Sequence, residues 1–331
     1  MKLKEGKPPQ EILEKIVYKH LGIFDPDVVQ GPAIGEDAGI VRLGDGFLVA
    51  HTDPITAAER FIGWLSVNVS ANDVAVRGAR PRWMLSTILL PPGTEDTVLE
   101  NIVKQMDKAA KEINVSIIGG HTEVTPGIPR PIIVSTAIGY TKHRIVRTGD
   151  ASPGDKVIII GRTGGEGAGV IAWDFEEKLL EKGISKNIID KAKEFIWDVS
   201  VVDKAMDILP HVSSMHDPTE GGILEGLLEL AQASGNTVIV NLDDIVIDDI
   251  VEAVTKPLKV DPLRLLSSGA LITAIPPYKV EEALSMLRSR NYSYCLCGEV
   301  VRGKPHLVIK KSGHKQASTT TIVDEIYKLW K

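Results

Sequence analysis

The sequence predicts an α/β (α+β) protein of two domains, each built from strands that alternate with helices. Apolar runs of strand length are followed repeatedly by segments with helical spacing of their apolar residues, which favours helices layered on sheets. The 331 residues suffice for one large or two medium domains. A turn-rich stretch, TGDASPGD at 148–155, divides the chain near its middle. We therefore expect a first domain over residues 1–150 and a second over residues 151–331.

The composition is that of an ordinary globular protein, with 43% hydrophobic and 25% charged residues. The net charge of −6, from 38 Lys and Arg against 44 Asp and Glu, argues against nucleic acid as the main partner. Apolar segments stay shorter than the ~20 residues that span a bilayer, so we expect no membrane association. Scarce cysteines and the lack of a signal peptide fit a reducing cytoplasm. Cys295 and Cys297 are expected as small apolar residues of a strand.

The elements of the first domain follow from apolar spacing and turn residues. We expect an amphipathic helix first, and then a hairpin around the turn at residues 44–46. Thr94 is placed to cap a helix whose apolar stripe runs from Val98 to Ile113. The first, amphipathic helix is expected over 9–21 and a further helix over 57–77, with strands over 40–42, 47–51, 83–90, 115–118 and 132–140.

The second domain begins with a short apolar strand that opens into the glycine-rich run GRTGGEGAG at 161–169. Such a turn can cradle phosphate with its N–H groups, or it can serve tight packing alone. Glu166 within it is expected to be exposed. In HDPTEGG, Asp217, Pro218 and Glu220 fit the N-cap, N1 and N3 positions of a helix. We expect helices over 170–182, 185–209, 223–234, 248–254, 280–290 and 322–330, and strands over 157–160, 212–215, 236–241, 270–275, 294–301 and 306–310, the last two as a closing pair.

Three acidic signatures between residues 35 and 81 carry the functional prediction. GED ends at Asp37, HTD ends at Asp53, and Asn72 with Asp73 forms an ND pair; each acid lies where an apolar run meets a loop. Carboxylates gathered by the fold repel one another unless a cation lies among them. Asn68 and Asn72 share a helical face that is either solvated or part of a site, and the Val and Ala residues around them favour the site. We predict a Mg²⁺ site serving the phosphates of a nucleotide.

Seven motifs occur in order along nearly the whole chain, namely GEDAGI, HTDPIT, NDVAVRGARP, GGHTEVTPG, SPGDKVIIIG, HDPTEGG and DPLRLLSSGAL. In that order they resemble the aminoimidazole ribonucleotide (AIR) synthase superfamily, and three of them resemble its hydrogenase-maturation HypE branch in particular. The resemblance implies an N-terminal domain that dimerises through its sheet, a C-terminal α+β domain beside it, and ATP in the cleft. It also implies that Mg-ATP phosphorylates an amide-type or other small-substrate oxygen.

The resemblance also implies roles for single residues. Ligands of Mg²⁺ are implied at Asp37, Asp53 and Asp73. Contacts to the nucleotide are implied for Asn72, Gly119, Gly120, Thr122, Asp217, Thr219 and Gly221. Catalytic roles are implied for Asp53, His121 and Glu123, while His121 can equally be a neutral loop residue bonded to backbone. Arginines that either reach phosphate or form a solvated helix end are Arg77, Arg80 and Arg82.

Three departures from the HypE pattern point to an altered substrate. That pattern ends in a tail with a terminal Cys, whereas this chain ends YKLWK; it has a Glu where this chain has Ser268; and several relatives carry an acid in place of His121. We expect an ATP-dependent enzyme. The alternatives are a non-catalytic nucleotide-binding protein in a maturation complex, a small-molecule kinase of the thiamine monophosphate kinase type, and a purely structural dimer. The expected partners are a small-molecule substrate, a second copy of the chain and a maturation protein.

Overall fold

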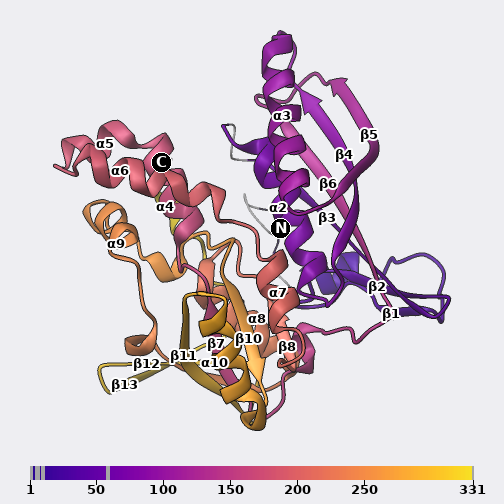
Figure 1. Cartoon of the computed structure of the whole chain (residues 1–331), viewed down its shortest axis with the longest axis vertical. Helices are drawn as coiled ribbons and strands as arrows, with labels where there is room; N and C mark the ends of the chain where they lie inside the picture. Colours follow the sequence, from indigo (N-terminus) through magenta and orange to yellow (C-terminus); the bar gives the residue numbers. More distant parts are fainter. Residues whose placement is uncertain (1–2, 4–7, 9–11, 57–59, 330–331) are drawn as a thin grey trace.

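The structure, a computed structural model, describes the whole chain except residues 1–2, 4–7, 9–11, 57–59 and 330–331. Within this part of the chain the strands form two sheets, one of six strands and one of seven. Each sheet belongs to one half of the sequence and carries its own helices, so the expected α/β (α+β) architecture is confirmed (Figure 1). None of the helices among the described residues is long and apolar enough to cross a membrane.

The first sheet has the strand order β1-β2-β3-β6-β4-β5. β4 and β5 run parallel, because α3 connects them as a crossover, and the other neighbouring strands are antiparallel. The expected hairpin is confirmed, since Leu43 pairs with Gly46 across its turn. The strands are β1 (Val28–Gln30), β2 (Gly39–Leu43), β3 (Gly46–Ile55), β4 (Pro81–Leu90), β5 (Ser116–Val124) and β6 (Ile132–Thr141).

Two helices, α2 (Ile62–Ala75) and α3 (Asp96–Glu112), cover one face of this sheet (Figure 1). All 14 residues of α2 are buried, because the sheet lies on one side of the helix and the second domain on the other. Leu85, on the opposite face of β4, is 39% exposed, and β5 is exposed along its whole length. Within the described residues, the sheet therefore presents one open face.

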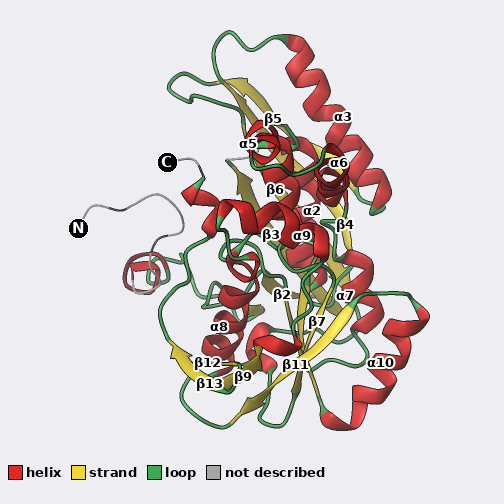
Figure 2. Ribbon diagram, turned by 90° about the vertical axis from the view of Figure 1, so that its left-hand side faces the viewer, coloured by secondary structure: helices red, strands yellow, loops and turns green. Residues whose placement is uncertain are grey.

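The second sheet has the strand order β13-β12-β9-β11-β7-β10-β8. Its inner strand β7 is buried on both faces: Val157 and Ile159 pack with α8 (Gly222–Ser234), whereas Ile158 and Ile160 pack with residues of α4 (Gly165–Asp174), α7 (Val202–Ile208) and α10 (Val280–Ser289). In Figure 2, α8 lies close to β9 and β12. The strands are β7 (Lys156–Ile160), β8 (Ser214–His216), β9 (Thr237–Asn241), β10 (Leu271–Ile275), β11 (Tyr294–Val301), β12 (Leu307–Lys311) and β13 (His314–Ser318).

Several expected elements of the second domain are wrong in detail. The helix expected over 185–209 is three pieces, α6 (Lys186–Lys193), η3 (Glu194–Trp197) and α7, and the expected helix over 170–182 is the end of α4 followed by α5 (Glu176–Glu181). β11 and β12 do not pair with each other, because β9 lies between them. The expected terminal helix is only the 3₁₀ turn η8 (Glu325–Lys328). The remaining helical segments are α9 (Asp249–Thr255), η2 (Thr148–Asp150), η4 (Leu242–Asp244), η5 (Lys256–Leu258), η6 (Pro262–Arg264) and η7 (Pro277–Lys279).

The first domain needs two corrections. The N-terminal helix is a single π-helical turn, η1 (Leu13–Val17), none of whose residues is buried; part of the expected range lies outside the described residues. Thr94 does not cap α3, because its hydroxyl donates to the carbonyl oxygen of Pro91 at 2.7 Å. Ile102, Met106 and Ala109 of the expected stripe are buried as expected.

An aromatic contact joins the two domains. Trp64 of α2 stacks edge-on against Trp197 with 5.0 Å between ring centroids, and its indole Nε1 donates to the carbonyl oxygen of Ile196 at 2.9 Å. Phe61 makes similar edge contacts with Trp173 and Trp197. The Lys108 ammonium lies 4.2 Å from the Trp197 ring centroid. These contacts fix the second domain against α2 and α3.

Candidate metal and nucleotide site

Three carboxylates from distant parts of the chain meet where the two domains touch. Asp37 lies in the loop before β2, Asp73 lies in the last turn of α2, and Asp217 directly follows β8. One oxygen of each lies within 4.8 Å of the others. Two of the three expected metal residues, Asp37 and Asp73, are thus brought together, and the third member is Asp217, which was expected to contact the nucleotide.

The third expected metal residue, Asp53, lies beside this cluster on β3. It pairs in register with Ser135 of β6, and its charge acts on Asp73. Two residues earlier on the same strand, His51 approaches Asp73, with 3.3 Å between Nε2 and Oδ2. Since successive odd positions of a strand share a face, His51 and Asp53 both face α2. Asp53 is therefore a neighbour of the cluster in the structure, and its role as a ligand stays a prediction.

Burial makes this cluster electrostatically costly. It raises the pKa of Asp73 well above its ordinary value, and the charges of Asp217, Asp37 and Asp53 raise it further. Burial, followed by the charge of Asp37, raises the pKa of Asp217 to about 7. Both carboxylate oxygens of Asp217 are buried, and within the described chain neither accepts a hydrogen bond from another residue's side chain or backbone. Buried oxygens without donors suit a hard divalent cation, so the residues present fit Mg²⁺.

The pKa of Asp37 is shifted in the opposite direction, downwards. Burial opposes its ionisation, but His216 and Arg77 outweigh burial and lower the pKa of Asp37. His216 Nδ1 lies 2.9 Å from Asp37 Oδ1, and Arg77 Nη2 donates to Asp37 Oδ2 at 2.5 Å. Asp37 is thus held as a carboxylate, whereas burial and neighbouring negative charges oppose the ionisation of Asp73 and Asp217.

The residues that hold Asp37 were missed or misread from the sequence. His216 lies between two carboxylates, since its Nε2 is 2.9 Å from Glu229 Oε2 of α8, and its pKa is raised well above the ordinary value despite burial. Arg77 was expected either at phosphate or at a solvated helix end. It is instead fully buried and pairs with Glu36 and Asp37. The signals were present in GED and HDPTEGG, where an ionisable residue directly precedes each cluster acid.

The side chain of Asn72 is committed to a contact between the domains. Its Nδ2 donates to the carbonyl oxygen of Val199, and its Oδ1 accepts from the Val201 N–H, each at 2.8 Å. Asn68, one turn earlier, is buried as expected and donates to the Trp64 carbonyl oxygen. These contacts engage both amide atoms of Asn72 in structure, so its contact to a nucleotide stays a prediction that the geometry does not favour.

The turn between β8 and α8 differs from the expected cap. α8 begins at Gly222 with Gly221 at its N-cap, in the left-handed region at φ 82°, so Asp217 and Glu220 do not occupy the N-cap and N3 positions. The Gly221 N–H donates to Asp324 Oδ2 at 2.8 Å. Thr219 accepts from the Gly222 N–H through its carbonyl oxygen. This segment begins at the cluster, at Asp217, and ends at the start of α8.

The GGHTE segment is an edge strand, whereas a loop was expected. Gly119, Gly120, His121, Thr122 and Glu123 all lie in β5, which two strands separate from β3 in the sheet. The His121 and Glu123 side chains are 64% and 49% exposed and contact each other, with 3.1 Å between Nε2 and Oε2. Within one chain, these residues are therefore not joined to the acidic cluster.

The glycine-rich run from residue 161 serves packing in this structure. α4 begins at Gly165, five residues earlier than expected, and a Cβ atom on Gly167 would lie 2.3 Å from Leu265 Cγ. Glu166 is buried, although exposure was expected, and it accepts a hydrogen bond from the Ser268 N–H at 3.1 Å. Burial raises its pKa.

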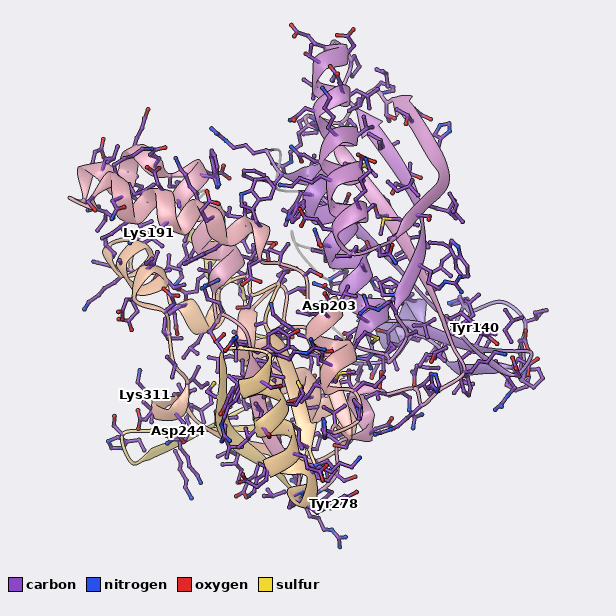
Figure 3. All side chains as sticks on the ribbon, viewed as in Figure 1. Tyr140, Lys191, Asp203, Asp244, Tyr278 and Lys311 are labelled. Atoms are coloured by element: carbon purple, nitrogen blue, oxygen red, sulfur yellow. The ribbon has the colours of Figure 1, made fainter. Side chains whose placement is uncertain are left out.

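The other two arginines expected at phosphate or at a solvated helix end, Arg80 and Arg82, lie at the surface. Arg80 pairs with Asp203 of α7 at 2.7 Å, and Figure 3 labels Asp203 where the second domain meets the first. The Arg82 guanidinium lies 4.4 Å from the Trp83 ring centroid. Neither contact involves the acidic cluster.

Two family models match the chain in tandem. The N-terminal domain model of AIR synthase related proteins matches residues 35–141, and the corresponding C-terminal domain model matches residues 152–310. A hydrogenase expression/formation protein of Methanocaldococcus jannaschii is 28% identical over 86% of this chain and 84% of that protein. A thiamine-monophosphate kinase of Pyrococcus horikoshii is 27% identical over 82% of this chain and 84% of that protein.

Solved structures of HypE proteins share the fold. The hydrogenase maturation protein HypE aligns with a TM-score of 0.71 and 26% identity over 87% of this chain and 93% of that one. HypE in complex with ATP aligns with a TM-score of 0.71 and 24% identity over 98% of both chains. A chain of a HypE–HypF complex gives a TM-score of 0.72 and 23% identity over 93% of this chain and 99% of that one. The chain therefore belongs to the AIR synthase related family, as a two-domain protein similar to HypE.

Proposed function

We propose that this protein binds Mg²⁺ and ATP at the Asp37–Asp73–Asp217 cluster and transfers the γ-phosphoryl group to an oxygen of a small substrate. The observation that carries the proposal is the buried Asp217 carboxylate: its oxygens accept no hydrogen bond from another residue of the described part of the chain, and it lies next to two further carboxylates. The names of relatives give further support, because one is a kinase and one HypE structure holds ATP.

Asp37, Asp73 and Asp217 would hold the cation, with Asp53 close by on β3. Bound Mg²⁺ neutralises phosphate charge and orients the transferred group. The protein's own contribution is a fixed frame for it: Arg77 and His216 keep Asp37 ionised and in place. Asp73 and Asp217 are buried, which strengthens their interaction with a cation.

Three activities are proposed for the site, in order of preference. An amide-type oxygen, whose phosphorylation permits loss of water or ring closure, follows from the similarity to HypE proteins. A kinase of the thiamine monophosphate type is the second candidate, favoured by the similarity to the Pyrococcus enzyme. A protein that binds nucleotide without turnover is the third, and the distance of His121 and Glu123 from the acids within one chain favours it.

The proposal includes the arrangement of domains and partners. Family matches on either side of residues 142–151 support a boundary near residue 150. The open face of the first sheet, with Leu85 at 39% exposure, supports a homodimer through that sheet. A maturation protein is a candidate partner, because a HypE protein forms a complex with HypF.

The test is Mg²⁺-dependent hydrolysis of ATP by the purified protein and its Asp73→Asn and Asp217→Asn variants. Asn mimics the neutral carboxyl group that burial favours, so both variants should fold while losing the cation. Asp203→Asn is the matched control, because Asp203 pairs with Arg80 at the surface with 74% of its side chain exposed. We expect loss of hydrolysis in both cluster variants and full activity in the control. Undiminished hydrolysis in both cluster variants would refute the assignment.

A further inference from the structure

A single buried guanidinium connects the segments that supply the acids of the site. Arg77 is 0% exposed. Its Nη1 donates to Glu36 Oε2 at 2.7 Å. Its Nη2 lies 2.5 Å from Asp37 Oδ2, 2.9 Å from Thr148 Oγ1 and 2.8 Å from the carbonyl oxygen of Met215. Four acceptors from three separate stretches of chain therefore meet at one planar group.

Arg77 lies close to each of the three cluster acids, either along the chain or through a contact. Arg77 follows Asp73 by four residues, just past the end of α2. It contacts Asp37 directly, and Met215 precedes Asp217 by two residues on β8. The first domain supplies Asp37 and Asp73, and the second supplies Asp217. The guanidinium thus spans the junction that sets the spacing of the three carboxylates.

Further hydrogen bonds hold the partners of Arg77 in place, and the Glu36 carboxylate offsets the charge of the guanidinium. Glu36, its other carboxylate partner, accepts from the N–H groups of Thr148 and Gly149 at 3.2 and 3.0 Å. Ser214 Oγ donates to the carbonyl oxygen of Thr148 at 2.8 Å, which ties the same stretch to β8. Because Glu36 offsets the charge of Arg77, the negative charge of Asp37 stays available to a cation.

We propose that Arg77 is a positioning residue for the cation site: its forked contacts hold Asp37 and the Asp217 strand at the separation that one divalent ion requires. The inference rests on the proposed metal function of the cluster. A guanidinium is suited to the task because its donors lie in a fixed plane, whereas a lysine ammonium offers one compact charge on a flexible stem. Lysine at this position keeps the charge and loses the geometry.

The experiment measures Mn²⁺ affinity by electron paramagnetic resonance on the full chain, without nucleotide, together with thermal unfolding. The variants are Arg77→Lys, Arg77→Met and Thr148→Val, with Arg80→Lys as the matched surface control. We expect Arg77→Lys to weaken Mn²⁺ binding by roughly 10- to 100-fold, the effect typical of partners that orient metal ligands. Arg80→Lys should bind as the unaltered protein does. A folded Arg77→Lys variant with unaltered Mn²⁺ affinity overturns the proposal.

Thr148→Val tests the positioning role if both Arg77 variants fail to fold, because it removes one contact of Arg77 Nη2 and leaves both ion pairs of Arg77 intact. A measurable loss of Mn²⁺ affinity supports the positioning role, and an unchanged affinity rejects it. Kinetics add a second readout: Arg77→Lys should raise the Mg²⁺ concentration needed for half-maximal rate more than it lowers kcat. A purely structural salt bridge would move the unfolding temperature and leave that concentration alone.

Asp73→Asn separates this inference from the proposed function. If the unaltered protein binds Mn²⁺ and Asp73→Asn abolishes binding, the site is established, and the Arg77 variants then test positioning alone. If Asp73→Asn and Asp217→Asn both bind Mn²⁺ normally, the metal site itself is misassigned, and the positioning role falls with it.

Discussion

His216 contacts Glu229 through the ring nitrogen that faces away from the acidic cluster, with 2.9 Å between His216 Nε2 and Glu229 Oε2. The other ring nitrogen meets Asp37. An imidazole between two carboxylates donates from both nitrogens, so it is charged, and its pKa is raised well above the ordinary value despite its burial. α8 therefore reaches the cluster through His216, and the second domain stabilises an acid of the first.

Replacing His216 by Asn should destabilise the protein in a pH-dependent way. The folded pKa of His216 is raised, so its contribution is fully present below the unfolded value of about 6.5 and is lost as pH rises through the folded pKa. The pKa of Asp37 is lowered, so its contribution is lost only as pH falls through that lowered value. Breaking such a buried pair costs about 3–5 kcal/mol. Urea unfolding across a pH series should give the largest difference between about pH 4 and 6.5, and a difference independent of pH would contradict this account.

Cation binding should release protons. The pKa of Asp217 is raised to about 7, and that of Asp73 is raised well above its ordinary value, so a cation should displace a proton from Asp217 at and below pH 7. We expect Mn²⁺ affinity to fall roughly tenfold per pH unit below pH 7 for each proton displaced. Calorimetry in buffers of different ionisation enthalpy measures the number released. Asp217→Asn should release fewer protons, and an affinity that does not change between pH 6 and 8 speaks against protonated acids.

Asp324→Asn should affect the stability of the protein more favourably at pH 8 than at pH 5. Asp324 accepts from the Gly221 N–H through Oδ2 and from the Ile326 N–H through Oδ1, so Asn loses one of these two bonds at any pH. Burial raises its pKa from 3.8 to about 7, so the folded state loses stability relative to the unfolded chain as pH rises from about 4 to 7. The shift corresponds to at most about 4 kcal/mol. Guanidinium unfolding at pH 5 and pH 8 tests this: the change in unfolding free energy caused by the substitution should be more favourable at pH 8, and an equal change at both pH values would count against it.

Gly120→Ala should disrupt the parallel pairing of β4 and β5. A Cβ atom at residue 120 would lie 1.9 Å from the carbonyl oxygen of Ser86, so the two strands must separate. The cost should be about 1–3 kcal/mol of unfolding free energy, as for other overpacking substitutions. Gly31→Ala is the matched control, because its added Cβ would meet only Val28 Cγ1 at 3.9 Å. Sedimentation velocity on the same variant tests the proposed dimer, which should weaken if β5 forms part of its interface.

The sequence predicted the parts of the site that depend on local pattern. Asp37 and Asp73 follow or end apolar runs, and each lies in the cluster as the pattern indicated. Strand and hairpin positions such as the turn between β2 and β3 also followed from nearby residues. The two-domain family architecture followed from motif order.

The partners of these acids could not be predicted, because they come from far along the chain. Arg77 meets a carbonyl oxygen 138 residues away, and Asn72 meets one 127 residues away. Glu166 lies in a run of small residues that suggested a loop, and only the approach of Ser268 shows why it is buried. The GGHTE residues were expected in a loop, whereas they lie in β5, and Gly120 is required by the close passage of β4.

The complete burial of α2 has a consequence for the order in which this protein acquires its fold. Trp64 and Asn72 find their partners at Ile196 and Val199, which are synthesised 132 and 127 residues later. Domains generally begin to fold during synthesis from the N-terminus. The apolar side of α2 that faces the second domain therefore stays exposed to solvent until residues 196–201 have left the ribosome. A nascent chain halted before that point should be a target for chaperones that bind exposed apolar helices.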